Sequence, residues 1–126
     1  MKRTQVITAK APSAIGPYSQ AISSGEMVFL SGQIPLKADG TMVPGGVAEQ
    51  TQQCLNNVRD ILTGAGHTMN DVIKTTVFMT DLGKFAEMNE VYGKYFRIPY
   101  PARSTVQVAA LPRGAEVEIE AVAVRP

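Results

Sequence analysis

A single long helical pattern limits what this chain can fold into. Residues 47–65 repeat apolar side chains at helical spacing, so that one face of the helix is apolar. That face carries Val47, Thr51, Cys54, Leu55, Val58, Ile61, Leu62 and Ala65. Gly64 and Gly66 are expected to end the helix. Because one amphipathic helix cannot bury its apolar face alone, the rest of the chain must supply a surface for it to pack on.

The residues before this helix are typical of short strands and loops. Lys2–Thr8 has the character of an edge strand, and prolines and glycines make Ala11–Pro17 a loop. Strands are expected at Ala21-Ile22 and Met27–Ser31, joined by a turn at Ser24-Gly25, with Gln33–Leu36 as a third short run. Asp39-Gly40 and Pro44-Gly45-Gly46 then mark a loop that leads into the helix.

After the helix, strand and helix patterns alternate again. Asp71–Met79 is rich in β-branched residues and predicts a strand. Asp81 is a candidate cap for a second helix, whose inner face would carry Phe85, Met88, Tyr92, Tyr95 and Phe96. Pro99 and Pro101 stop that helix. Two final strands are expected at Ala102–Leu111 and Glu116–Val124, joined by a turn at Pro112-Arg113-Gly114.

The predicted order is therefore β-β-β-α-β-α-β-β, an α+β fold in one domain, residues 1–126. Two helices can cover one face of such a sheet but not both. Yet the strands are apolar on both faces. In Val72–Met79, for example, Val72 and Phe78 would lie on one face, and Ile73, Val77 and Met79 on the other. An uncovered apolar face calls for another protein surface, so we expect a homo-oligomer that packs the helix-free sheet faces together.

Charge and composition exclude several classes of function. The chain has 12 Lys+Arg against 11 Asp+Glu, and such a balance attracts neither nucleic acid nor an anionic membrane. It has no apolar run of about 18 residues and no secretion signal at its N-terminus. Its one cysteine, Cys54, cannot form an internal disulfide. These observations predict a cytoplasmic protein with no membrane or nucleic-acid partner.

The residue types behind common catalytic centres are scarce. A single histidine, His67, excludes His-rich metal sites and weakens any nucleophile–histidine arrangement, and we expect it in a solvated loop. Cys54 lies on the apolar face of the first helix and is expected to be a core thiol. Gly64-Ala65-Gly66 ends a helix instead of starting one, so it cannot cradle a phosphate. We therefore expect no metal and no cofactor.

Arginine and carboxylate chemistry remains. Arg103 lies just inside a strand with small or apolar neighbours, and its planar guanidinium suits a carboxylate ligand or an internal ion pair. On general grounds the structural ion pair is the commoner case. Glu116, Glu118 and Glu120 alternate along the last strand and would share one face, either as exposed edge charges or as site residues. If the last two strands are neighbours, Arg103 and one of these carboxylates could form a minimal hydrolytic site.

Four more positions are candidates with ordinary alternatives. Tyr18 follows Gly16-Pro17, which would aim its phenol at a fixed point, although half-buried packing explains it as well. Ser31 and Gly32 end a hydrophobic strand, where a glycine permits close backbone approach or simply a turn. Asn89 interrupts the inner face of the second helix and is either a hydrogen-bonded brace or support for a site.

Taken together these segments resemble the Rid (YjgF) family of reactive-imine deaminases over essentially the whole chain. The segments that carry the resemblance are Ala14–Ala21, Ser31–Pro35, Lys74–Phe78, Met88–Tyr92, Pro101–Ser104 and Val117–Ala123. Within the family the chain is most similar to the RidA-type 2-iminobutanoate/2-iminopropanoate deaminases. The resemblance implies a chorismate-mutase-like fold with a mixed sheet, a homotrimer with clefts between subunits, and detoxification of reactive intermediates of amino-acid metabolism by hydrolysis to 2-oxo acids and ammonia.

The resemblance also implies residue roles. Arg103 would grip the substrate carboxylate, Glu118 would orient the attacking water, and Tyr18 would close the cleft from the neighbouring subunit. Gly32 and Thr105 would contact the ligand through their backbone, with Ser31 and Asn89 bracing the site. Thr105 stands where these proteins often carry cysteine. Arg103 would also keep Glu118 ionised. Two other roles remain open, a ligand-sensing or chaperone-like trimer without turnover and an endoribonuclease or translation inhibitor.

Overall fold

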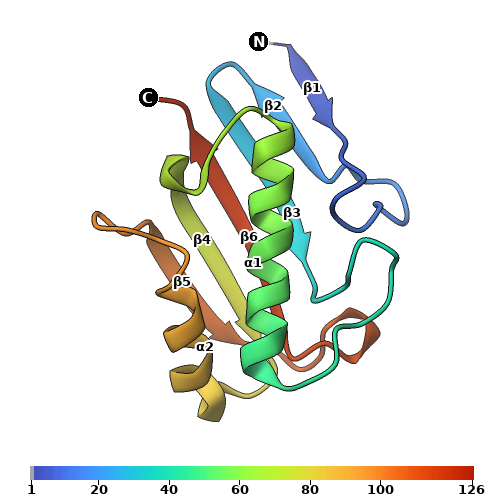
Figure 1. The fold of residues 1–126 in the computed structure, drawn as a ribbon, viewed down its shortest axis with the longest axis vertical. Coiled ribbons are helices and arrows are strands. Elements are labelled where there is room, and N and C mark those ends of the chain that lie inside the picture. Colours follow the sequence, from blue (N-terminus) through green and yellow to red (C-terminus); the bar gives the residue numbers. More distant parts are fainter. Residues whose placement is uncertain (1) are drawn as a thin grey trace.

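The computed structural model describes residues 2–126 and contains one six-stranded sheet (Figure 1). The strands are β1 (Arg3–Val6), β2 (Ala21–Ser24), β3 (Met27–Gln33), β4 (Val72–Met79), β5 (Ala102–Gln107) and β6 (Val117–Val124). They lie in the order β1-β2-β3-β6-β4-β5, and only the β4–β5 pair is parallel. The sheet is therefore mixed, as expected.

Two helices cover one face of this sheet. Helix α1 (Val47–Gly64) packs on β6 and β3, and the shorter α2 (Phe85–Tyr92) lies in the connection from β4 to β5 (Figure 1). The predicted order of main elements is thus confirmed. Among residues 2–126, neither helix has the length and hydropathy needed to cross a membrane.

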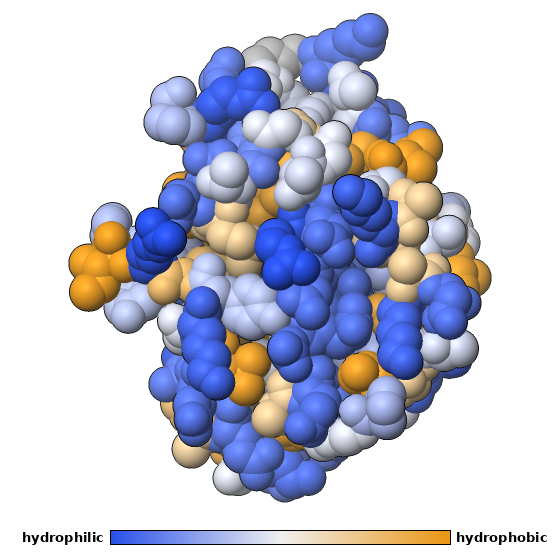
Figure 2. Space-filling model, viewed as in Figure 1, coloured by the Kyte–Doolittle hydropathy of each residue, from blue (hydrophilic) through white to orange (hydrophobic). Residues whose placement is uncertain are grey.

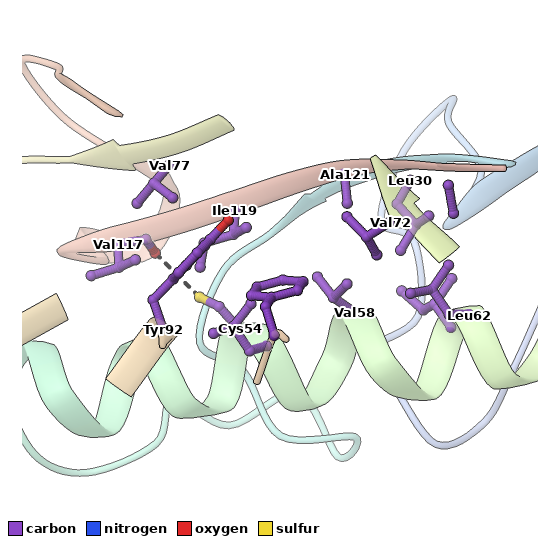
Figure 3. Packing of buried hydrophobic residues seen from close by; sticks show 14 of the residues in the cluster. Leu30, Cys54, Val58, Leu62, Val72, Val77, Tyr92, Val117, Ile119 and Ala121 are labelled. Carbon is purple, nitrogen blue, oxygen red and sulfur yellow. Dashed lines mark hydrogen bonds between the residues drawn. The ribbon is translucent and has the colours of Figure 1, made fainter. Parts of the chain in front are cut away.

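The core lies between α1 and the sheet. Cys54, Leu55, Val58, Ile61 and Leu62 on α1 are fully buried against β6 and its neighbours, as the helical pattern predicts (Figure 3). On β6, Val117, Ile119, Ala121 and Ala123 point toward α1, and the residues between them point to the other side of the sheet. We call these two sides the helix face and the open face.

Hydrogen bonds at both ends hold helix α1 in place. At its start, the backbone N–H of Gly46 donates to the Glu49 carboxylate at 2.8 Å. At its end, the left-handed Gly66 (φ 80°) turns the chain, and the Arg125 guanidinium donates to the carbonyl of Gly66 at 3.0 Å. The final residues of the chain therefore support the helix at its negative end.

Three predicted strand boundaries are wrong. The Gln33–Leu36 run is not a strand, because only Gln33 belongs to β3 and Leu36 forms an isolated bridge to Met42. The N-terminal strand ends at Val6, not at Thr8. The predicted strand Ala102–Leu111 ends at Gln107, since the chain must leave the edge strand there and pass β4 to reach β6.

The second helix also begins later than its pattern suggests. Asp81 caps a short 3-10 turn, Leu82–Lys84, by accepting from Gly83 N–H at 2.8 Å, and α2 starts only at Phe85. Met88 and Tyr92 are buried on its inner face as predicted. Phe96 is buried too but lies beyond the end of the helix.

His67 and Glu116 also differ from expectation. His67 is buried, not solvated, because it packs beside Asp71 with 3.3 Å between its Nδ1 and a carboxylate oxygen. Glu116 precedes β6 and forms an ion pair with Lys84 at 2.9 Å, so it does not share a sheet face with Glu118 and Glu120. Cys54 is a core thiol as expected: it lies 3.6 Å from the Val117 carbonyl, and burial raises its pKa.

Candidate functional site

Strand order places the two principal candidates on opposite sides of the sheet. Arg103 is level with Thr75 on β4, whose buried side chain faces the helices. Glu118 is level with Phe78 and lies between Val117 and Ile119, so it points to the open face. The prediction that β5 and β6 are neighbours is wrong, because β4 lies between them and separates them by about 10 Å. One chain therefore does not bring Arg103 and Glu118 into one site.

The Glu118 cleft is the first of two candidate half-sites. It is a hollow of about 460 Å³ lined by four of the predicted residues, Tyr18, Ser31, Gly32 and Glu118, together with mostly apolar side chains. A β-bulge between Leu30 and Gln33 interrupts the pairing of β3 with β6 at this point. The bulge puts the Gly32 backbone directly beneath the Glu118 carboxylate.

Gly32 is required here by close approach. A Cβ built on it would overlap the Glu118 carboxylate oxygen Oε2 and lie 2.9 Å from Cδ. The absence of a side chain thus lets the carboxylate lie flat over the strand at the floor of the cleft. This agrees with the close backbone approach that the Ser31-Gly32 pair suggested.

The wall opposite Glu118 is a loop, residues 8–20, that is anchored by one buried side chain. Gln20 is 4% exposed; its Oε1 accepts from Thr8 N–H at 2.8 Å, and its Nε2 donates to the carbonyls of Thr8 and Pro12 at 3.1 and 2.8 Å. The Ser31 hydroxyl donates to the Ser19 carbonyl at 2.6 Å. Ser31 therefore ties the end of β3 to the loop.

Tyr18 lies on this anchored loop in the same chain as Glu118. Its side chain is about half exposed, and its hydroxyl accepts from Ile15 N–H at 3.3 Å. The ring lines the Glu118 cleft on one side and a second, shallower hollow on the other. A phenol at this mouth can cover a small ligand bound over Gly32.

The Arg103 pocket is the second half-site, a hollow of about 450 Å³ between α2 and the start of β5. The guanidinium donates to Asn89 Oδ1 at 2.8 Å. Its central carbon stands 4.7 Å from the ring centroid of Tyr92 and 5.4 Å from that of Phe85. Such stacking on aromatic faces holds a guanidinium in one orientation while its remaining N–H groups stay free for a ligand.

Tyr92 is itself fixed from behind. Its hydroxyl forms a 2.6 Å hydrogen bond with the buried Thr75 hydroxyl of β4, and burial raises its pKa. Asn89 is therefore a hydrogen-bonded brace for Arg103, as the polar interruption of the helix suggested. Thr105 follows Arg103 on the same face of β5, level with Val77, but does not line the pocket.

Four residues of the two half-sites were not singled out from the sequence as site residues: Gln20, Phe85, Tyr92 and Arg113. Phe85 and Tyr92 did stand on the predicted inner face of α2, and Asn89 has the spacing that puts it beside them. Gln20 gives no such signal because its partners, Thr8 and Pro12, lie in an irregular loop without a periodic pattern. Arg113 gives none because its contact, the Gly40 carbonyl, is 73 residues away in the chain.

The environment of Glu118 differs from what was expected. Burial raises the pKa of its carboxyl, and the nearby Glu120 carboxylate raises it further. Arg103 of the same chain stands on the other face and does not keep Glu118 ionised. Within residues 2–126, no cluster of three or more His, Cys, Asp or Glu side chains is arranged to hold a metal ion.

Replacing Gly32 by alanine is expected to lower the rate of a reaction that uses the Glu118 carboxylate about 10- to 100-fold, with little change in thermal stability. The new methyl group must push the Glu118 carboxylate off its position, and displacements of about 1 Å in a reacting group have effects of this size. Steady-state kinetics and thermal unfolding measure the two effects. Gly64→Ala is the matched control, since its Cβ would make only an ordinary 3.5 Å contact with Thr8. Unaltered activity in Gly32→Ala would contradict a role for the Glu118 carboxylate.

Known proteins resemble this chain over nearly its full length. The family model described as Endoribonuclease L-PSP matches residues 8–125. The mouse protein named 2-iminobutanoate/2-iminopropanoate deaminase is 50% identical over 124 residues, which cover 98% of this chain and 92% of the mouse protein.

Two solved structures from Escherichia coli show the same fold. One is the yjgF gene product, 45% identical, with a TM-score of 0.94 and coverage of 98% of this chain and 99% of the other. The second is TdcF with bound serine, 48% identical, with a TM-score of 0.93 and the same two coverages.

Proposed function

The chain belongs to the YjgF/Rid family, and we propose on that premise that it is a hydrolytic deaminase of small 2-imino acids such as 2-iminobutanoate and 2-iminopropanoate. The products would be the corresponding 2-oxo acids and ammonia. The observation that carries the proposal is the Arg103 pocket, where a guanidinium held by Asn89, Tyr92 and Phe85 keeps N–H donors free for a planar carboxylate.

The chemistry needs little beyond orientation and modest charge stabilisation. Arg103 binds the carboxylate of the imino acid, and Glu118 holds a water molecule against the adjacent C=N carbon. Water adds to that carbon, and one of its protons passes to the nitrogen by way of Glu118 to give a carbinolamine. The hydroxyl proton of the carbinolamine then passes to the nitrogen as the C–N bond breaks, which forms the C=O group of the 2-oxo acid and releases ammonia. Tyr18 covers the cleft from the mouth, which limits the escape of the intermediate.

Such a site requires more than one copy of the chain. Arg103 and Glu118 lie on opposite faces of the sheet, so the Arg103 pocket of one copy must meet the Glu118 cleft of another. A contact of this head-to-tail kind can close into a ring. The family resemblance supplies the number of copies, and we propose a homotrimer with three shared sites. The open face offers apolar surface for the assembly, since Phe29, Ile73 and Val106 are each 40–49% exposed there or at its edge.

The relatives support this reaction class. The mouse relative takes its name from 2-iminobutanoate and 2-iminopropanoate, and the E. coli relative TdcF binds serine, an amino acid that shares a carboxylate next to a nitrogen-bearing carbon. The ligand class that suits the Arg103 pocket is therefore the class that these names describe.

The decisive experiment follows the decay of 2-iminobutanoate made from threonine by a dehydratase, with and without this protein. The protein is expected to accelerate 2-oxobutanoate formation in proportion to its concentration. Spontaneous hydrolysis supplies the baseline, and heat-denatured protein supplies the control. If decay is unchanged by native protein while 2-oxobutanoate still binds, the chain is a ligand sensor and not a deaminase.

The family model's description favours one second candidate, an endoribonuclease. The near-neutral charge of the chain gives RNA no basic surface of the usual kind. Incubation with labelled RNA tests this candidate, and cleavage that Arg103→Ala leaves intact would assign the nuclease activity to another part of the surface.

Removal of the Glu120 charge is expected to shift the acid limb of the pH–rate profile to lower pH. Glu118 must be ionised to hold the water, and Glu120 beside it raises its pKa, so activity is lost as pH falls through that raised value. In Glu120→Gln the like charge is gone and Glu118 stays ionised to lower pH. The ratio of variant to wild-type kcat/KM, measured as a function of pH, removes the titration of the substrate itself. A shift toward higher pH would contradict the assignment.

A further inference from the structure

Arg113 holds an unusual backbone conformation at the edge of the Glu118 cleft. It has φ 61° and ψ 20°, and it is the only non-glycine residue within residues 2–126 with a positive φ. This left-handed conformation is strained for an arginine, and such strain persists where the surrounding structure imposes it. Here the turn Pro112–Gly114 ends in Ala115, which is 1% exposed and anchors the segment ahead of β6.

Arg113 is one of the residues that line the cleft, and its guanidinium has no carboxylate partner among residues 2–126. Its Nη1 donates to the Gly40 carbonyl at 3.4 Å, a long hydrogen bond that leaves the other N–H groups free. No ion pair involves it among residues 2–126, and Glu118 is the only acidic residue that lines the cleft. The rest of the lining is neutral and largely apolar, including Ile15, Ile34 and Leu36.

The proposed reaction fixes which part of a substrate would meet Arg113. The carboxylate next to the C=N carbon is taken by Arg103 of a second copy, and the water stands at Glu118. In the proposed binding mode the third substituent of that carbon, the amino-acid side chain, would extend along the Glu118 cleft. A cation in the wall of this cleft is placed to bind an acidic group at the far end of that side chain.

We propose that Arg113 is a specificity-determining residue and that the substrates include imines of acidic amino acids, 2-imino dicarboxylates of the 2-iminosuccinate class. This inference rests on the proposed function and adds a substrate class to it. The reaction is the same hydrolysis: water adds to the C=N carbon, the C–N bond breaks, and ammonia leaves with a dicarboxylic 2-oxo acid. No oxidant or reductant is consumed in the step.

The test compares two substrates in one protein. 2-Iminosuccinate is generated from L-aspartate with an aspartate oxidase, 2-iminobutanoate from threonine with a dehydratase, and the ratio of their kcat/KM values is measured. Two variants are compared: Arg113→Asn removes the charge with a residue that tolerates positive φ, and Arg113→Lys keeps the charge with a side chain whose backbone preference is like that of arginine. We expect the ratio to fall about tenfold or more in Arg113→Asn and to stay within about threefold of wild type in Arg113→Lys.

A control variant at a second basic residue tests whether the effect of Arg113→Asn comes from the lost contact and not from the changed net charge of the chain. Lys94 is exposed on the helix side and lines neither half-site, so Lys94→Gln should leave the ratio unchanged. An unchanged ratio in Arg113→Asn would overturn the proposal while leaving the deaminase assignment intact. Equal losses on both substrates would overturn it too, because Arg113 would then act on the carboxylate common to both. Failure of the wild-type protein on 2-iminobutanoate would instead reject the proposed function.

Discussion

Arg103→Ala is expected to reduce kcat/KM for 2-iminobutanoate by about two to three orders of magnitude. The guanidinium is held by a 2.8 Å hydrogen bond to Asn89 and by the rings of Tyr92 and Phe85, so it meets the substrate carboxylate without further ordering. Loss of a charged, bidentate contact in such a pocket costs about 3–4 kcal/mol. Arg103→Lys keeps the charge but loses the planar, two-pronged geometry of the guanidinium. Its kcat/KM should therefore lie between those of the wild-type protein and Arg103→Ala.

The measurement is the initial rate of 2-oxobutanoate formation over a range of imine concentrations. Arg3→Ala is the control, because Arg3 lies on the edge strand β1 and lines neither half-site. Arg103→Ala also removes the contact of the guanidinium with the ring of Tyr92, a core residue, so a small loss of thermal stability is expected beside the much larger loss of activity. If Arg103→Ala had the same kcat/KM as the wild-type protein, the fold assignment would be unaffected, but Arg103 would not be a substrate-binding residue.

Mixing two inactive variants is expected to restore about a quarter of wild-type activity. In a ring with shared sites, each site takes Arg103 from one copy and Glu118 from its neighbour. In a random equimolar assembly of Arg103→Ala and Glu118→Ala chains, about one site in four then contains both native residues. The expectation follows from the opposite sheet faces on which the two side chains lie.

The two variants are co-expressed with different affinity tags, and activity is measured in the unsorted mixture and in hybrid oligomers isolated by sequential purification. Isolation removes the rings of a single variant, so one site in three of each remaining trimer is native and the expected recovery rises to about a third. Light scattering at low micromolar concentration gives the number of copies, which should be three of 13.5 kDa each. Each variant alone is the baseline, and the double variant Arg103→Ala/Glu118→Ala mixed with wild type is the control for dilution of native copies. Hybrid oligomers without recovered activity would show that the two residues do not share a site between copies.

The local pattern of the chain was sufficient for most of its elements. Helix α1 follows from apolar spacing over residues 47–64, and β4 follows from β-branched residues over Val72–Met79. Both signals depend only on residues close in the sequence, because the period of the pattern is the period of the element. The sequence also predicts that both faces of the sheet are apolar, and Phe29 and Ile73 are exposed on the side without helices.

The strand ends needed information from elsewhere in the fold. Residues 108–111 have the composition of a strand, but the chain leaves β5 at Gln107 to cross β4, and that path depends on the sheet order. Gln33–Leu36 fails as a strand for a similar reason: Asn57 of α1 donates to the carbonyls of Ile34 and Leu36, at 3.3 and 2.9 Å, in place of a neighbouring strand. Backbone partners of this kind are chosen by packing and not by local preference.

The same division applies to the candidate site. Amino-acid types and the family resemblance together indicate which side chains belong to the site, because the chemistry of an anion-binding guanidinium and a water-holding carboxylate is a property of side chains. These residues are Arg103, Glu118, Tyr18, Ser31, Gly32, Thr105 and Asn89. Which of them meet was decided by the tertiary structure alone. The insertion of β4 between β5 and β6, and the two-residue alternation of side chains, put Arg103 with Asn89 on the helix face and Glu118 with Gly32 on the open face. Strand order is a long-range property that no local pattern encodes, and it turns one predicted site into two halves.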